Sequence, residues 1–194
     1  MQTDLKFASN LRIAVLLVGV VIGFTIPANG ADGRSFRQAV FPIYNSKSPR
    51  AIAVVRAEES FRDYLQKGFF KIGVFPIRVV KNLEIELLQP EAAKEALAKA
   101  ARHLSDRGRL QGFDVEKFSL AAKPGKGGGF RLYAARITHL RGGAWKLTQG
   151  HFQQGDVRHE FASAKLLLKS DTPELVLPDQ THFKLTVQKQ TKQP

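Results

Sequence analysis

The chain has 194 residues, a formal net charge of +13 and no cysteine. A cysteine-free sequence excludes thiol catalysis, thiolate metal sites, disulfides and lipid attachment through a cysteine. A charge of this size attracts polyanions and anionic surfaces, or it serves only solubility and non-specific adhesion.

The first thirty residues have the pattern of an export signal. Lys6 and Arg12 precede an apolar run at 13–24, and the small residues Ala28 and Gly30 stand at −3 and −1 before Ala31. The run has about a dozen residues, whereas a membrane-spanning helix needs about 20. We therefore expect residues 1–30 to be a cleaved signal peptide, with retention as an anchor as the alternative. The expected location is exported, either periplasmic or extracellular, where lipid and lipopolysaccharide phosphates are the available anions and nucleic acid is not.

Residues 31–50 are polar and rich in turn residues, which predicts a flexible lead-in. Residues 51–188 are expected to form a single β-rich domain. Its first strand lies at 51–55, and residues 58–65 fit either a helix or the end of a long strand. Period-2 alternation predicts strands within 69–88, with Pro76 marking a sheet edge or a bend.

One helix is expected at about 90–107. Pro90 and Glu91 suit its first turn, and the segment that follows is rich in strong helix formers. An apolar stripe at helical spacing is expected to pack on the sheet; it consists of Ala93, Leu97, Ala100 and Leu104.

Strands are expected from there to the end of the domain. The alternation in 113–122 changes parity near Lys117, which predicts a bulge. Further strands are expected at 130–140, 145–153, 157–169, 175–177 and 183–187, with a loop at 123–129 and a frayed tail at 189–194. The predicted fold class is α+β and mainly antiparallel β, either an open β-roll (jellyroll-like) or a meander sheet, with one amphipathic helix.

Catalytic and metal-binding motifs do not emerge from the sequence. The glycine cluster at 125–129 lacks the spacing of a phosphate loop, and the five histidines form no H-E-x-x-H. No G-x-S-x-G elbow occurs, and the carboxylates are interleaved with cations as on solvated strands. We therefore expect no enzyme, no cofactor and no metal site, and keep a periplasmic hydrolase as a third, weaker hypothesis.

Two hairpins share a pattern about 30 residues apart, which favours stacked strand pairs. The first contains Leu132-x-x-Ala135-Arg136-Ile137, and the second contains Phe161-x-x-Ala164-Lys165-Leu166. Together with the export signal and the basic charge, this pattern resembles the periplasmic lipopolysaccharide-transport family with the OstA-like β-jellyroll. In that family the inside of an open β-roll holds acyl chains.

The resemblance implies an apolar lining for acyl chains, drawn here from Phe118, Leu120, Leu132, Ile137, Trp145, Leu147, Phe161 and Leu166. The alternative is that these eight residues are ordinary core. A basic rim that meets phosphates is predicted at Arg131, Arg136, Arg141, Lys146 and Lys165.

The function predicted from the sequence is that of a non-catalytic, exported cell-envelope protein. It would bind an amphipathic anionic ligand such as lipopolysaccharide or another lipid, with peripheral contact to a membrane surface. The second hypothesis is an assembly or adaptor protein that binds an envelope protein by β-augmentation at a sheet edge.

Overall fold

The computed structural model describes residues 35–46, 49–67, 70–122, 129–168 and 172–186. The chain divides into the units 1–30 and 31–194, and every described residue belongs to the second. The predicted signal peptide, most of the loop at 123–129 and the predicted tail lie outside the described residues. Within the described part, no helix is long and apolar enough to cross a membrane.

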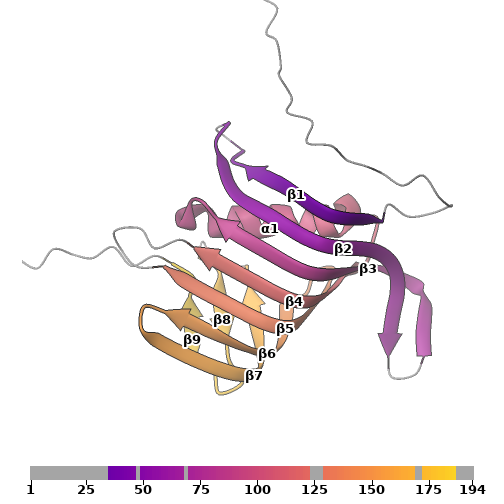
Figure 1. Ribbon diagram of the computed structural model, residues 1–194. Coiled ribbons are helices and arrows are strands. Elements are labelled where there is room, and N and C mark those ends of the chain that lie inside the picture. The colour runs from indigo at the N-terminus through magenta and orange to yellow at the C-terminus, as the bar shows by residue number, and fades with distance from the viewer. Residues whose placement is uncertain (1–34, 47–48, 68–69, 123–128, 169–171, 187–194) are drawn as a thin grey trace, which may run out of the picture. The chain divides into compact units, whose positions relative to one another are not determined.

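The described strands form one nine-stranded sheet whose spatial order follows the chain (Figure 1). Neighbouring strands are antiparallel except β3 and β4, which are parallel. The predicted α+β fold, mainly antiparallel with one helix, is therefore confirmed. The strands follow one another in chain order, and the parallel β3–β4 pair departs from a pure meander. The strands are β1 Phe36–Tyr44, β2 Ala51–Lys67, β3 Phe70–Leu87, β4 Gly112–Ala122, β5 Phe130–Leu140, β6 Trp145–Gln154, β7 Val157–Leu167, β8 Glu174–Val176 and β9 His182–Lys184.

The parallel pair exists because a helical crossover connects its strands, as parallel pairing requires. The crossover comprises the 3-10 turn η1 (Pro90–Ala92), the helix α1 (Ala93–Leu104) and the 3-10 turn η2 (Asp106–Gly108). This confirms the predicted helix and its packing, since α1 contacts β1, β2 and β3. Its buried residues are Ala93, Ala96, Leu97, Ala100 and Leu104.

The prediction of a flexible lead-in is wrong for residues 36–44, which form the edge strand β1 and pair with β2. Ala39 and Ile43 of this strand are buried in the core. The alternation was hidden because polar residues and Pro42 interrupt the apolar ones. The ambiguous segment 58–65 belongs to β2, and β3 reaches Pro76 at a register irregularity opposite Tyr64, in agreement with the predicted bend.

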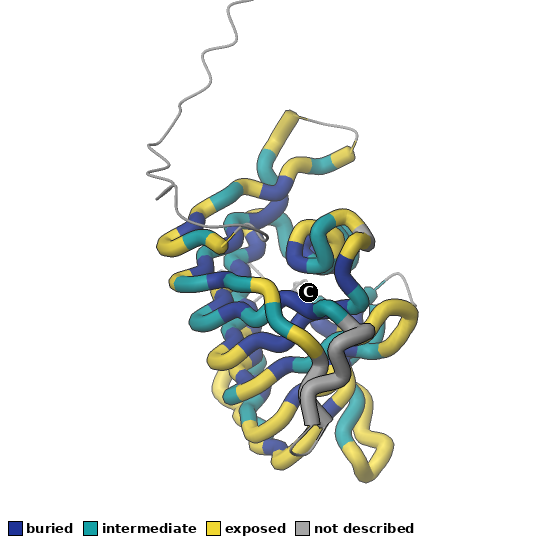
Figure 2. The backbone as a smooth tube through the Cα atoms, turned by 90° about the vertical axis from the view of Figure 1, so that its right-hand side faces the viewer, coloured by how far each residue is buried: buried dark blue, intermediate teal, exposed yellow. Residues whose placement is uncertain are grey.

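In each of the seven long strands, β1 to β7, the buried side chains change at one point from even to odd residue numbers or the reverse. These points lie in a row across the sheet, which we call the crease. Four non-glycine residues in this row, Gln38, Asn82, Lys117 and Gln149, have left-handed backbones with φ between 48° and 58°. Pairing is one-to-one on both sides of the row. Buried and exposed positions otherwise alternate along the strands (Figure 2). The parity change predicted near Lys117 is therefore present and spans the sheet, but it is not the predicted bulge, because β4 and β5 pair without a register shift across it.

At the crease, two consecutive side chains of each long strand point away from the core. The sheet curls around α1 (Figure 1). The crease also corrects the predicted hairpin repeat. Phe161 shares its row with Ala134, and Ala164 shares its row with Ile137. The expected equivalence of Leu132 with Phe161 is therefore displaced by two residues. The outward pairs are Arg37–Gln38, Glu58–Glu59, Lys81–Asn82, Glu116–Lys117, Ala135–Arg136, Thr148–Gln149 and Ala162–Ser163.

Candidate anion-binding pocket

The eight residues predicted to line an acyl-chain slot all lie in one buried core cluster. Their exposed fractions do not exceed 8%. Trp145 illustrates the packing, because its ring meets the edges of Phe113 and Phe118 with centroid distances of 5.2 and 6.2 Å. These side chains pack together in the core, as the alternative interpretation of ordinary core expects.

The five cations of the predicted rim are exposed. Arg136 forms a two-pronged ion pair with Asp114, and Lys146 faces Lys165 across adjacent strands. The rim residues on strands β5 to β7 are Arg131, Arg136, Lys146 and Lys165. Arg141, in the turn between β5 and β6, is the member of the set that lines a pocket.

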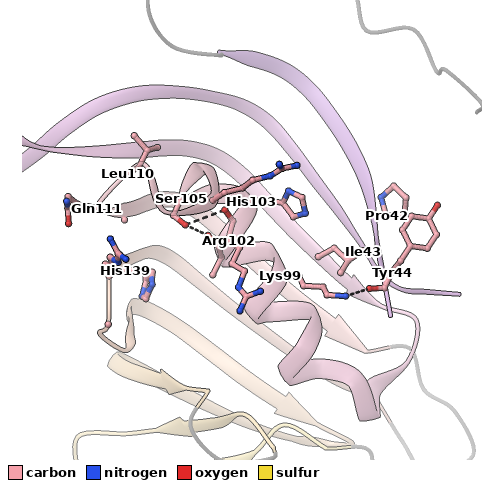
Figure 3. Close-up of a pocket in the computed structure, with 15 residues that line it drawn as sticks. Pro42, Ile43, Tyr44, Lys99, Arg102, His103, Ser105, Leu110, Gln111 and His139 are labelled. Carbon is pink, nitrogen blue, oxygen red and sulfur yellow. Dashed lines mark hydrogen bonds between the residues drawn. The ribbon is translucent and has the colours of Figure 1, made fainter. Parts of the chain in front are cut away.

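This pocket has a volume of about 960 Å³ and lies beside the second half of α1 (Figure 3). One wall is the end of β1, from Pro42 to Tyr44, and the opposite wall contains His139 of β5. Residues of η2 and of the β5–β6 turn complete it. The site therefore depends on β1, the strand that the sequence did not predict, and on the curvature that brings β1 and β5 to the two sides of α1.

The pocket is lined by many basic side chains and also has an apolar part. Among the described residues that line it there is no Asp or Glu. Its apolar part comes from Pro42, Ile43, Ala101 and Leu110. Its basic side chains are Lys99, Arg102, His103, Arg107, His139 and Arg141.

The carbonyl groups at the C-terminal end of α1 are engaged within the fold. The Ala101 carbonyl accepts hydrogen bonds from the backbone N–H and the hydroxyl of Ser105, at 2.9 and 2.8 Å. Arg78, which is buried, donates from Nε to the Leu104 carbonyl at 2.9 Å. The negative end of the helix dipole is thus partly compensated before any pocket cation is used.

The side chain of Lys99 has partners within the fold, whereas the side chains of the three pocket arginines have none among the described residues. Lys99 donates to the Tyr44 carbonyl at 2.6 Å and pairs with Glu95 at 2.8 Å, which fixes the end of β1 to the helix (Figure 3). Within the described part of the chain, the side chains of Arg102, Arg107 and Arg141 make no hydrogen bond or ion pair. Three guanidinium groups therefore remain available to an anion.

His139 gives the pocket a titratable group. Its ring lies 4.9 Å from the ring of Phe113 and 6.1 Å from that of Trp145, centroid to centroid. Burial lowers the pKa of His139, and a weaker interaction with the Ala144 backbone opposes this shift. Nδ1 of His139 is buried and has no hydrogen-bond partner among the described residues. At neutral pH the ring is therefore neutral and has one nitrogen unsatisfied.

The backbone is strained or closely packed at two points of the pocket. Asp106 and Arg107 are consecutive non-glycine residues with φ of 48° and 55°, a conformation that concentrates at functional sites. Gly112 lies against β5 so closely that a Cβ would come within 1.9 Å of the His139 carbonyl oxygen. Glycine at 112 thus allows the approach of β4 and β5 at the pocket wall.

Sequence reasoning placed the cations on the strands and missed those of the helix and its turn. A signal was present, because Lys99, Arg102, His103, Arg107 and Arg109 fall within eleven residues that contain one carboxylate, Asp106. Arg107 was interpreted only as part of the helix terminus. The β1 wall had no comparable signal.

No protein-family model matches the chain, and no curated protein or solved structure is significantly similar to it. The resemblance to the lipopolysaccharide-transport family therefore depends only on the sequence features that suggested it, namely the strand pattern, the export signal and the basic charge. Among the described residues, no group of three or more His, Asp or Glu is placed to hold a metal ion.

Proposed function

We propose that the protein is a non-catalytic, exported cell-envelope protein that binds an amphipathic anion such as lipopolysaccharide or another lipid. The pocket beside α1 is its proposed binding site. One observation carries the proposal: three guanidinium groups without partners in the described chain line a pocket that has an apolar part and no carboxylate. Guanidinium groups of this kind pair with phosphate and carboxylate oxygens.

The charge distribution supports recruitment as well as binding. A net charge of +13 draws anionic ligands and surfaces toward the molecule, and salt screens this long-range attraction. The pocket adds short-range contacts, which salt weakens less than it weakens contacts on an open surface. The proposed interaction therefore combines a salt-sensitive encounter with a bound state that persists at moderate salt.

The closed core limits how much of a lipid the protein takes in. The eight predicted lining residues pack on one another, so acyl chains find no room among them without displacing core side chains. The apolar part of the pocket comes from the short segment Pro42–Ile43 and from Ala101 and Leu110. The proposal is therefore that the anionic group enters the pocket while most of a multi-chain lipid stays outside, in peripheral contact with the protein.

The proposal is tested with two matched triple variants that each remove three positive charges. The pocket variant carries Arg102→Gln, Arg107→Gln and Arg141→Gln, and the control carries the same type of change at three exposed positions of β5, β6 and β7: Arg131→Gln, Lys146→Gln and Lys165→Gln. Binding to vesicles that contain lipid A is measured at low and moderate salt. We expect the pocket variant to bind at least about tenfold more weakly than the control. Equal losses in both variants, or no binding by the parent protein, would contradict the proposal.

The adaptor hypothesis retains one supporting observation, since β1 is an edge strand that pairs on one side only within the described residues. Two features of β1 oppose β-augmentation. Pro42 has no N–H to donate, and Gln38 interrupts the extended backbone with a φ of 51°. Binding of a protein partner that survives high salt and is lost on further proline substitution in β1 would favour this function over the first.

A further inference from the structure

We infer that the pocket beside α1 recognises a phosphomonoester group, with Arg102, Arg107 and Arg141 as its main contacts. This inference rests on the proposed function and narrows its ligand. The three arginines come from different elements, since Arg102 lies on α1, Arg107 in η2 and Arg141 in the β5–β6 turn. A group that satisfies all three must accept hydrogen bonds in several directions.

The number of donors favours phosphate over carboxylate. Each guanidinium presents five N–H donors, and a carboxylate has two oxygens, both of which face one guanidinium in a two-pronged contact. A phosphomonoester has three terminal oxygens and carries a charge of about −1.5 to −2 near neutral pH. It can therefore pair with two or three guanidinium groups at once, whereas a carboxylate offers one oxygen fewer and a smaller negative charge to the same groups.

The surroundings of the three arginines support a doubly charged ligand. The pocket lining adds Lys99, His103 and His139 and contributes no carboxylate among the described residues. Lys99 is held by Glu95 and the Tyr44 carbonyl, so it supplies charge to the wall more than a contact. Nδ1 of His139 is buried, so this nitrogen is not open to a ligand in the pocket, and the ring responds to a bound anion through the charge of that anion.

The remainder of the ligand is restricted by the apolar part of the pocket. Pro42, Ile43, Ala101 and Leu110 offer contact for a short chain or a backbone fragment, and the core behind them is closed. Two sources of the phosphomonoester fit this description. One is a lipid whose phosphate enters the pocket while its chains stay in a membrane, and the other is a soluble phosphomonoester.

The first test compares two amphiphiles with the same chain and different head groups, decyl phosphate and decanoate, by calorimetry at pH 7.5 below their micellar concentrations. We expect decyl phosphate to bind about tenfold or more tightly, because it adds charge-assisted hydrogen bonds. The preference should disappear in the Arg102→Gln, Arg107→Gln, Arg141→Gln variant and persist in the Arg131→Gln, Lys146→Gln, Lys165→Gln control. Thermal unfolding checks that both variants fold.

A second readout is the NMR titration of the His139 ring. A bound phosphate dianion should raise the pKa of His139, because a nearby negative charge favours the protonated ring. Decanoate should raise it less. An unchanged His139 pKa on saturation with decyl phosphate would overturn the inference, since the anion would then lie outside this pocket.

The outcomes separate this inference from the proposed function. Equal affinity for decyl phosphate and decanoate, lost in the pocket variant, would overturn the phosphomonoester inference and leave the proposed function standing. Failure of both amphiphiles and of lipid A vesicles would overturn both.

Two further arms identify the source of the group. Tighter binding to phosphatidic acid vesicles than to phosphatidylserine vesicles of equal charge would support a lipid source. Equally tight binding of glycerol 3-phosphate in free solution would support a soluble one.

Discussion

Arg78 is predicted to be the residue on which the geometry of the pocket depends most. It is 8% exposed, and it joins β3 to the end of α1 through the Leu104 carbonyl and to β2 through the Ser60 hydroxyl, at 2.9 and 3.2 Å. An Arg78→Met substitution keeps an unbranched apolar stem, which is shorter than that of arginine, and removes the guanidinium group with both of these hydrogen bonds. The helix end that carries Arg102 and leads to Arg107 would lose its hydrogen bond to β3 and keep only its apolar packing on the sheet.

The expected cost follows from the groups left behind. Ser60 is fully buried, and a buried polar group that loses its partner costs about 1–3 kcal/mol. Two such groups, the Leu104 carbonyl and the Ser60 hydroxyl, bring the loss for Arg78→Met to about 3 kcal/mol. For a domain of this size, 1 kcal/mol corresponds to a change in Tm of about 2–4 °C. We therefore expect the Tm to fall by about 6–12 °C.

The assay is thermal and urea unfolding followed by circular dichroism, with Arg109→Met as the matched control. Arg109 is exposed near the same helix end and has no side-chain partner among the described residues, so its substitution should change stability by less than about 0.5 kcal/mol. If Arg78→Met and Arg109→Met unfold at the same temperature, Arg78 does not anchor the helix and the reasoning is refuted.

Three further predictions concern the backbone and the charges around the pocket. Gly112→Ala should lower the free energy of unfolding by about 3 kcal/mol or more, because its Cβ would collide with a backbone oxygen of β5, whereas Gly155→Ala, in open space at a φ of +59°, should cost about 1 kcal/mol. A smaller loss at 112 than at 155 would contradict this packing. Lys117→Gly should leave stability unchanged or raise it by up to about 1 kcal/mol, since glycine relieves the left-handed strain, while Ser119→Gly on the same strand should destabilise; equal losses would show that the crease is not strained. Hydrogen bonds to Lys99 and Ser46 lower the pKa of Glu95 from 4.5 to about 2, so its stabilising contribution is present above pH 4.5 and is lost as the pH falls from there toward 2. Urea unfolding between pH 2 and 6 should show a shallower pH dependence for Glu95→Gln, and an unaltered profile would count against the network.

Much of the fold follows from local sequence patterns. The helix was predictable because its formers, its first-turn proline and its apolar stripe agree with one another, and Leu97 and Leu104 are buried as expected. Strand β5 was predicted with its observed bounds, since alternation and flanking glycines define it. Features that depend on residues nearby in the sequence could therefore be predicted.

The strand β1 and the crease across the sheet depend on partners far along the chain. The backbone of Gln38 or Gln149 is left-handed because its neighbours in the row must change parity together, and neither residue type indicates this alone. Large apolar residues flank the parity change on both sides in β4, around Lys117, and in β3, between Val80 and Leu83. In the other strands, alanine or a polar residue at the step conceals the pattern.

The pocket could not be assembled from the sequence because its walls meet only in three dimensions. Arg141 was selected as a basic rim residue, yet its neighbours in the pocket come from the helix and from β1, about 40 and 100 residues away. The acyl-chain lining was plausible because core and binding residues are both apolar. Burial of Leu120 and Phe118 in a closed core is a property that the sequence does not reveal.

The most direct test of the account maps the ligand onto the protein by amide chemical shifts during titration with decyl phosphate. We expect the largest changes at the amides that surround the pocket, among them Ala101, Gly112 and Gly142. Changes concentrated at Trp145 and Leu120 would place the ligand in the core. Changes spread over the outward residues of β5 to β7 would show that the ligand binds to the basic surface of these strands. Either result would contradict the proposed pocket.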